Sequence, residues 1–130
     1  MPAPIPCNPL VLVVDDDLPT REALSLILTA EGYRVRTAPD GLAALRELRD
    51  GDRPCLIVLD LMMPIMDGWQ FRHEQRRDSQ LADIPVIVCS AAGRVRQRAA
   101  DLQAIAYFDK PLDPMDLLAA IRHYCPIPPG

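Results

Sequence analysis

The chain has 130 residues and a mass of 14.4 kDa, with 49% hydrophobic and 25% charged residues, which fits one globular domain and excludes disorder along its whole length. Its net charge of −4 at pH 7 lacks the basic excess that binding to a phosphate backbone requires, so no direct contact with nucleic acid is expected. No apolar run approaches the ~20 residues that span a bilayer, and the N-terminus lacks the basic and apolar regions of a signal peptide. These features predict a cytoplasmic protein without a membrane partner.

Proline and cysteine positions refine this picture. Seven of the 14 prolines lie at the two ends, so residues 1–9 and 126–130 are predicted as Pro-rich flexible tails around one domain at 10–125. The cysteines are widely spaced and form no CxxC pair: Cys7, Cys55, Cys89 and Cys125. This spacing favours reduced, buried thiols over disulfides or a zinc site.

Five short apolar segments predict five strands, at Leu10–Val14, Tyr33–Ala38, Leu56–Leu59, Val86–Cys89 and Ala106–Phe108. The first, third and fourth are unbroken runs of aliphatic residues, as in strands buried on both faces of a parallel sheet. The second alternates with Arg34 and Arg36 and therefore predicts an exposed edge strand.

Helix patterns follow each strand. The predicted helices run from a cap at Asp17 to Gly32, from a cap at Asp40 to Gly51, over Gly68–Arg77, over Arg94–Gln103, and onward from a cap at Asp113. Three apolar stripes are expected to face the core: Leu24, Ile27 and Leu28; Leu42, Leu45 and Leu48; and Leu117, Leu118 and Ile121. The run Arg72–Arg77 is interpreted as a polar surface. The alternation predicts an α/β fold with helices on both faces of a five-stranded parallel sheet.

Polar side chains stand where the predicted strands end. The first strand leads into Asp15, Asp16 and Asp17, and the third into Asp60. The fourth leads into Ser90 and the fifth into Lys110. Ligands of open α/β sheets bind beyond the carboxyl ends of the strands, so these groups are expected to meet at one edge.

Two carboxylates about 4 Å apart repel by roughly 4 kcal/mol at an effective dielectric constant near 20. A cluster of this kind either raises a pKa or binds a cation, and oxygen ligands favour a hard ion such as Mg²⁺, for which Mn²⁺ could substitute. Beside such an ion, Asp60 could attack a phosphoryl group. An isolated acidic pair is usually a helix cap, a lone serine a turn and a Lys-Pro step a loop. Their joint placement at one edge is what favours a functional site.

Four segments in order resemble the response-regulator receiver domain, the phosphoacceptor module of two-component signalling, over about Leu10–Tyr124. They are Val11–Asp17, Ile57–Gly68, Pro85–Ala91 and Tyr107–Pro111. The resemblance implies a flavodoxin-like, doubly wound sheet with the strand order 2-1-3-4-5. It also implies a Mg²⁺-dependent reaction with a histidine kinase or a histidine phosphotransfer protein.

By this resemblance Asp60 would be the phosphorylated residue, hydrogen-bonded through its phosphoryl group to Ser90 and paired with Lys110. The metal ligands would be Asp16, Asp60 and the backbone carbonyl of Met62, with Asp15 acting through water. Tyr107 would turn inward when Ser90 moves. Lys110–Pro111 would be a cis peptide bond, and Ala91 would leave the donor a path to Asp60.

Two departures from the family pattern stand out. Ser90 and Lys110 are only 20 residues apart, which predicts a short or displaced fourth helix. Met62 replaces a more usual polar side chain, which predicts an altered dephosphorylation rate. The resemblance further implies an unidentified downstream protein bound at the face of the fourth helix, fifth strand and fifth helix, and a monomer or weak dimer.

Two other functions compete with this reading. A phosphatase of the haloacid dehalogenase type also uses an aspartate and Mg²⁺, but its DxDx[TV] motif would place Pro19 where threonine or valine belongs. The other alternative is a docking module that folds like a receiver and is never phosphorylated. The chain is expected to be a regulatory domain rather than a turnover enzyme, and its sequence leaves open whether it stands alone or belongs to a longer protein.

Overall fold

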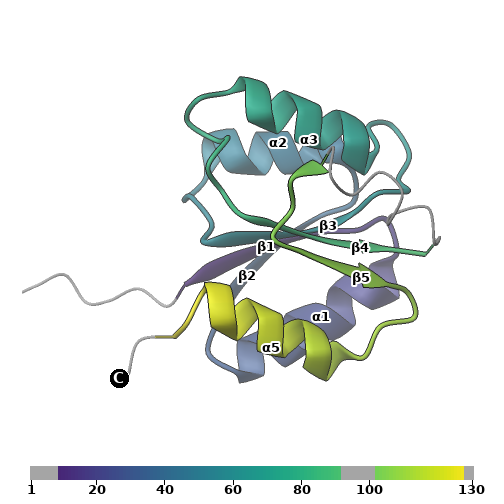
Figure 1. Ribbon diagram of the computed structural model, residues 1–130, viewed down its shortest axis with the longest axis vertical. Coiled ribbons are helices and arrows are strands. Elements are labelled where there is room, and N and C mark those ends of the chain that lie inside the picture. Colours follow the sequence, from purple (N-terminus) through teal and green to yellow (C-terminus); the bar gives the residue numbers. More distant parts are fainter. Residues whose placement is uncertain (1–8, 92–101, 128–130) are drawn as a thin grey trace, which may run out of the picture.

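The computed structural model describes residues 9–91 and 102–127. Its elements, in chain order, are β1 Leu10–Val14, α1 Leu18–Ala30, β2 Arg34–Ala38, α2 Gly41–Asp50, β3 Leu56–Asp60, α3 Gly68–Arg77, β4 Val86–Ser90, β5 Ala106–Asp109 and α5 Pro114–Tyr124. The five strands pair in parallel in the order β2-β1-β3-β4-β5. Figure 1 shows three layers, with α2 and α3 above the sheet and α1 and α5 below it. This is the predicted architecture.

The strands match their predicted positions closely. β3 and β4 each extend one residue further than expected, so that Asp60 and Ser90 are the last residues of their strands. Most of the predicted fourth helix, Arg94–Gln103, lies outside the described residues, and so do its arginines Arg94, Arg96 and Arg98. The same holds for residues 1–8 and 128–130 of the predicted tails. No helix in the described part of the chain is long and apolar enough to cross a membrane.

The sheet separates two apolar clusters. Successive side chains of a strand point to opposite faces, and β1 shows this directly. Val11 and Val13 pack on the side of α1 and α5, whereas Leu12 and Val14 pack on the side of α2 and α3. β1, β3 and β4 are buried along their whole length, and β2 is partly exposed, which confirms the predicted edge strand.

The predicted aspartate caps are present. The Asp17, Asp40 and Asp113 carboxylates accept hydrogen bonds from backbone N–H groups in the first turns of α1, α2 and α5. One apolar stripe is wrong: Leu42 is 37% exposed, while Ala44, Leu45 and Leu48 are buried. The buried face of α2 begins at Gly41 and repeats every three to four residues, so Leu42 is rotated by about 100° from that face.

The prediction that Arg72–Arg77 is a polar surface is also wrong at two positions, since Arg72 is 7% exposed and Gln75 is fully buried. The Arg72 guanidinium donates to the Leu102 and Gln103 carbonyl oxygens and to Gln75 Oε1. Gln75 in turn donates to the carbonyl oxygens of Leu81 and Ile84. The pair is buried because it satisfies backbone acceptors on the segments that precede β4 and β5.

The expected state of the cysteines needs a further correction. Cys55 and Cys125 form a disulfide, with a Cα–Cα distance of 6.2 Å. Sequence spacing could not reveal this contact, because the two residues are 70 positions apart and meet only when α5 packs against the sheet. Cys89 is a buried free thiol, as predicted, and burial raises its pKa to about 12.

Candidate functional site

Three carboxylates meet at the carboxyl ends of β1 and β3. Asp15 and Asp16 follow β1, Asp60 ends β3, and ligand atoms of all three lie within 4.8 Å of one another. The two strands are hydrogen-bonded neighbours, with Val14 opposite Leu59, so the fold itself brings these side chains together. Asp15 and Asp60 are buried and Asp16 is exposed. The predicted acidic cluster is therefore present.

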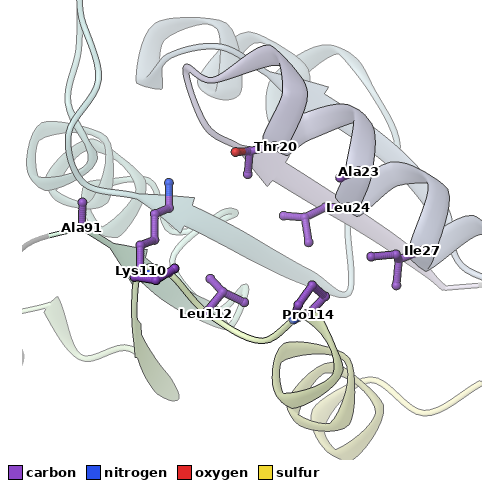
Figure 2. Close-up of a pocket in the computed structure, with 9 residues that line it drawn as sticks. Thr20, Ala23, Leu24, Ile27, Ala91, Lys110, Leu112 and Pro114 are labelled. Carbon is purple, nitrogen blue, oxygen red and sulfur yellow. The ribbon is translucent and has the colours of Figure 1, made fainter.

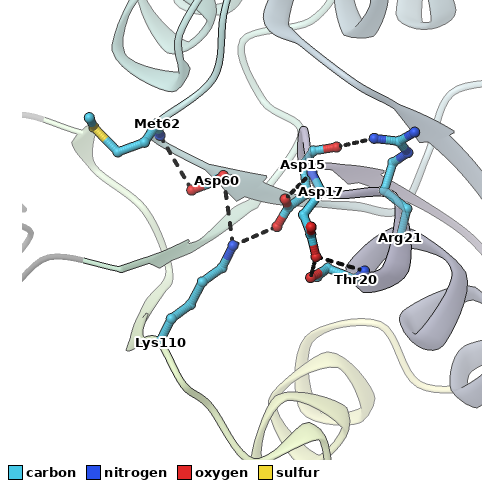
Figure 3. A network of polar contacts seen from close by, with 7 residues as sticks. All are labelled: Asp15, Asp17, Thr20, Arg21, Asp60, Met62 and Lys110. Atoms are coloured by element: carbon cyan, nitrogen blue, oxygen red, sulfur yellow. Dashed lines mark hydrogen bonds and ion pairs between the residues drawn. The ribbon is translucent and has the colours of Figure 1, made fainter.

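Lys110 completes this cluster from the loop after β5 (Figure 3). Its Nζ atom lies 2.7 Å from Asp15 Oδ2 and 3.7 Å from Asp60 Oδ2. It is the only lysine in the sequence. Burial lowers the pKa of Lys110, but the hydrogen bond to Asp15 and the charge of Asp60 outweigh it, so the net shift is upward and the side chain is a cation.

Asp15 is held by protein groups at both carboxylate oxygens. Oδ1 accepts the backbone N–H of Asp17 at 2.9 Å, and Oδ2 accepts Lys110. Its backbone carbonyl accepts the Arg21 guanidinium at 2.7 Å. Asp15 is thus fixed in place, whereas the neighbouring Asp16 is exposed to solvent.

Asp60 carries an unusually basic carboxylate. Burial raises its pKa to about 6, and the Asp15 and Asp16 charges act in the same direction. The Lys110 charge and the hydrogen bond from the Met62 backbone N–H, which lies 3.3 Å from Oδ1, lower the pKa. Three carboxylates share one nearby ammonium, so the cluster has an excess of negative charge. Carboxylate oxygens in this arrangement fit a hard divalent cation.

The remaining predicted site residues have different surroundings. Ser90 is buried at the end of β4, and its backbone oxygen accepts the Lys110 N–H at 2.8 Å. Met62 is 65% exposed. The Tyr107 hydroxyl accepts the Ala104 N–H at 3.0 Å, so this side chain is engaged near β5 rather than with the carboxylates. Lys110–Pro111 is cis, as expected.

Gly68 is a site-positioning residue that the sequence did not identify. A Cβ atom there would lie 2.4 Å from the Asp60 carbonyl oxygen and 2.7 Å from Leu61 Cα. The Gly68 N–H also donates to the Leu61 carbonyl oxygen at 3.0 Å. The start of α3 therefore packs directly on the backbone that carries Asp60. The Gly in Asp67-Gly68 was visible as a helix-start signal, but this close approach was not.

A groove opens beside Lys110, between α1 and the loop that joins β5 to α5 (Figure 2). Its volume is about 490 Å³, and its lining is mainly apolar. The lining residues include Ala23, Leu24 and Ile27 from α1 and Lys110, Leu112 and Pro114 from the opposite wall. Ala91 also lines it. The charged end of the groove is therefore continuous with the carboxylate cluster.

The chain is similar to known proteins in sequence and in fold. Residues 11–122 match the family model of the response regulator receiver domain. The chain is 42% identical over 114 residues to the response regulator MprA of Mycobacterium ulcerans. The alignment covers 86% of this chain and 48% of that protein. It is 37% identical over 116 residues to the DNA-binding dual master transcriptional regulator RpaA of Synechocystis, covering 88% and 48%. The chain thus spans about half the length of these relatives.

A similar solved structure is that of the response regulator protein TrrA from Thermotoga maritima in complex with Mg²⁺ and BeF. It superposes with a TM-score of 0.79 at 29% identity, covering 89% of this chain and 98% of that one. The family model spans most of the chain, and the fold superposes on that of a solved response regulator. The chain therefore belongs to the response-regulator receiver domains of two-component signalling.

Proposed function

We propose that Asp60 is the phosphoacceptor of this receiver, taking its phosphoryl group from a histidine kinase or a histidine phosphotransfer protein. The observation that carries this assignment is the meeting of three carboxylates within 4.8 Å beside the single lysine of the chain. Asp15 and Asp60 are the two buried carboxylates, and Asp60 has the longer ion pair of the two, since Lys110 Nζ lies 3.7 Å from Asp60 and 2.7 Å from Asp15.

The cluster is proposed to hold Mg²⁺ through Asp16, Asp60 and the Met62 backbone carbonyl, with Asp15 acting through water. The protein contacts at both Asp15 oxygens support this indirect role, and the exposure of Asp16 supports a direct one. A bound Mg²⁺ would neutralise charge on the transferred group. Mn²⁺ has the same preference for oxygen ligands and is proposed as a substitute.

In the transfer step, an Asp60 oxygen attacks the phosphorus atom of the phosphohistidine. A P–O bond forms and the P–N bond breaks, with the electron pair returning to the imidazole nitrogen. Lys110 stabilises negative charge on the phosphoryl oxygens, as ammonium groups do in phosphoryl transfer. Ser90 is proposed to hydrogen-bond the product, and Tyr107 to change position with it.

The donor protein is proposed to occupy the groove between α1 and the loop after β5. This groove ends at Lys110, so a helix lying in it would bring its histidine to the cluster. The apolar lining suits an amphipathic helix of the donor. The phosphorylated domain would then act on a downstream protein through the face that includes β5 and α5.

The remaining properties follow from this role. We propose a regulatory domain that catalyses its own phosphorylation and dephosphorylation and turns over no other substrate. The net charge of −4 supports the absence of nucleic-acid contacts by these residues, although the relative RpaA is a DNA-binding regulator. A cytoplasmic monomer or weak dimer, with the domain at residues 10–125 and tails at 1–9 and 126–130, is proposed.

The proposal is tested by incubating the protein with Mg²⁺ and acetyl phosphate and measuring the intact mass. The wild type is expected to gain one phosphoryl group, and Asp60→Asn none. Asp83→Asn, at an exposed position away from the cluster, is the matched control and should react like the wild type. Chelation of the metal should abolish the product. Full incorporation into Asp60→Asn would overturn the assignment.

The two alternatives make different predictions. In a haloacid-dehalogenase-like phosphatase, Asp15 and Asp17 would be the DxD pair, but the Asp17 carboxylate caps α1 through Thr20. Turnover of a phosphate ester by Asp60→Asn would support that enzyme. A docking module that is not phosphorylated would show no mass gain in the wild type.

A further inference from the structure

A disulfide lies at the end of the fold opposite the carboxylate cluster. Cys55 immediately precedes β3 and Cys125 immediately follows α5. Asp60 is at the other end of β3, five residues along the strand, or roughly 16 Å away. The Cα–Cα distance of 6.2 Å between the cysteines lies within the span that a disulfide bridges.

The backbone holds the two cysteines together independently of their sulfur atoms. The Cys55 N–H donates to the Leu10 carbonyl oxygen at 2.8 Å, which ties it to β1. The Cys125 carbonyl oxygen accepts the Tyr33 hydroxyl at 2.8 Å, and its N–H donates to Ile121. None of these hydrogen bonds involves a sulfur atom, so reduction of the disulfide removes none of them directly.

The two sulfur atoms differ in access. Cys125 is 1% exposed, whereas Cys55 is only partly buried. Cys89, on the same side of the sheet, is 3% exposed and has no cysteine partner in the described part of the chain. A reagent from solvent therefore meets Cys55 first, and Cys125 is placed to react with whatever forms there.

We propose that Cys55 and Cys125 form a reversible thiol–disulfide exchange site for low-molecular-weight disulfides of the glutathione type, with Cys55 as the attacking and Cys125 as the resolving thiol. The Cys55 thiolate attacks one sulfur of the reagent, forming a mixed disulfide and releasing one glutathione thiolate. The Cys125 thiolate then attacks the Cys55 sulfur and releases the second. Both released thiolates take up the protons lost by the cysteines, so two protein thiols are oxidised and one glutathione disulfide is reduced.

Oxidation joins the end of α5 covalently to the start of β3. In the reduced protein α5 is held by packing of its buried face and by the Tyr33 contact. Because the crosslink joins residues 70 positions apart, it removes many conformations from the unfolded chain. The oxidised protein is expected to unfold about 10 °C higher than the reduced one.

The order of attack is tested in a Cys7→Ser/Cys89→Ser background treated with glutathione disulfide, followed by alkylation and intact mass analysis. The parent should lose both alkylation sites and retain no glutathione. Adding Cys125→Ser should trap one glutathionyl group on Cys55. Adding Cys55→Ser should give little or no adduct. Equal adducts in the two variants, or alkylation of both cysteines in the treated parent, would overturn the proposal.

Peptide mapping of the wild type after the same treatment keeps the test independent of these substitutions. The peptides containing Cys55 and Cys125 should be linked, and the link should disappear with dithiothreitol. Phosphorylation by acetyl phosphate should be retained in both oxidation states, which separates this proposal from the assignment of Asp60. A wild type without the linked peptide contradicts the exchange site alone.

Discussion

Lys110 Nζ lies 2.7 Å from Asp15 Oδ2, which joins the loop after β5 to the end of β1 across 95 positions of sequence. The contact is closer than the 3.7 Å between the same ammonium and Asp60. Asp15 therefore holds the Lys110 ammonium next to Asp60, the proposed phosphoacceptor. It follows that Lys110 both compensates the cluster and competes with any cation for its carboxylates.

Replacing Lys110 with methionine should separate these two effects. Phosphorylation by acetyl phosphate should slow by about 100-fold, because one charge-stabilising donor is lost. Mg²⁺ affinity should rise, because the carboxylates lose their internal counter-ion. Mass spectrometric rates and calorimetric titration measure the two quantities. Arg122→Met, which removes a surface charge paired with Glu31, is the control. A lower Mg²⁺ affinity together with slower phosphorylation would contradict the inference that Lys110 competes with the cation.

Asp60→Asn should stabilise the metal-free protein. Above about pH 6 the folded protein must hold a buried, ionised Asp60, whose pKa is about 6 instead of 3.8. The folded state therefore binds more protons than the unfolded state between these values, and stability falls as the pH rises through them. At pH 8 the substitution should add up to about 3 kcal/mol, and near pH 3 almost nothing. Urea unfolding at both pH values, with Asp83→Asn as control, measures this difference.

Gly68→Ala should damage both stability and phosphorylation. Its methyl group would lie 2.4 Å from the Asp60 carbonyl oxygen, and backbone must move to relieve the contact. We expect a loss of about 1–3 kcal/mol in urea unfolding and a slower reaction with acetyl phosphate. Gly51→Ala is the matched control, because its new methyl group meets only the guanidinium end of the Arg36 side chain, which pairs with Glu47, and no backbone. Equal losses for the two variants would contradict the proposed close packing.

Arg72→Met should loosen the segment before β5. It removes the donors to the Leu102 and Gln103 carbonyl oxygens and leaves Gln75 without one partner. The free energy of unfolding should fall by about 2–3 kcal/mol, and amide exchange should accelerate at Ala104 and Tyr107. Arg77→Met removes an exposed pair with Glu74 and should change stability by less than about 0.5 kcal/mol. Unchanged exchange before β5 would argue against this tether.

Ala23→Glu should discriminate between phosphodonors. Ala23 lies in the wall of the groove beside Lys110, so a carboxylate there should obstruct a protein donor. Transfer from a phosphorylated histidine phosphotransfer protein should slow at least 10-fold, whereas reaction with acetyl phosphate should be unchanged. Leu26→Glu, on an exposed part of α1 outside this groove, is the control. Equal effects of the two variants would place the donor elsewhere.

The sequence predicted the sheet and the acidic cluster because both depend on local signals. Unbroken aliphatic runs indicate buried strands, and parallel strands carry whatever follows them to one edge. Asp15, Asp60 and Lys110 could be brought together on this basis without any knowledge of side-chain positions. The family resemblance then assigned roles to them that composition alone could not.

Predictions failed where a side chain's surroundings come from distant segments. Arg72 resembles its exposed neighbours in sequence, and only the carbonyl groups of residues 102 and 103 make its burial favourable. Cys55 and Cys125 were expected to be reduced because their spacing reveals nothing about the packing of α5. The prediction that Leu42 is buried was wrong for a simpler reason: a shift of one position along a helix moves a side chain out of the buried face.

The single lysine of the chain has one further consequence. Every other basic side chain except the two histidines is a guanidinium, so a reagent specific for side-chain amines can react with one side chain in this protein. That side chain is Lys110, whose ammonium donates a hydrogen bond to Asp15. Acylation of a lysine side chain anywhere in the molecule is therefore acylation of the site itself, and it removes the charge that Asp15 and Asp60 share.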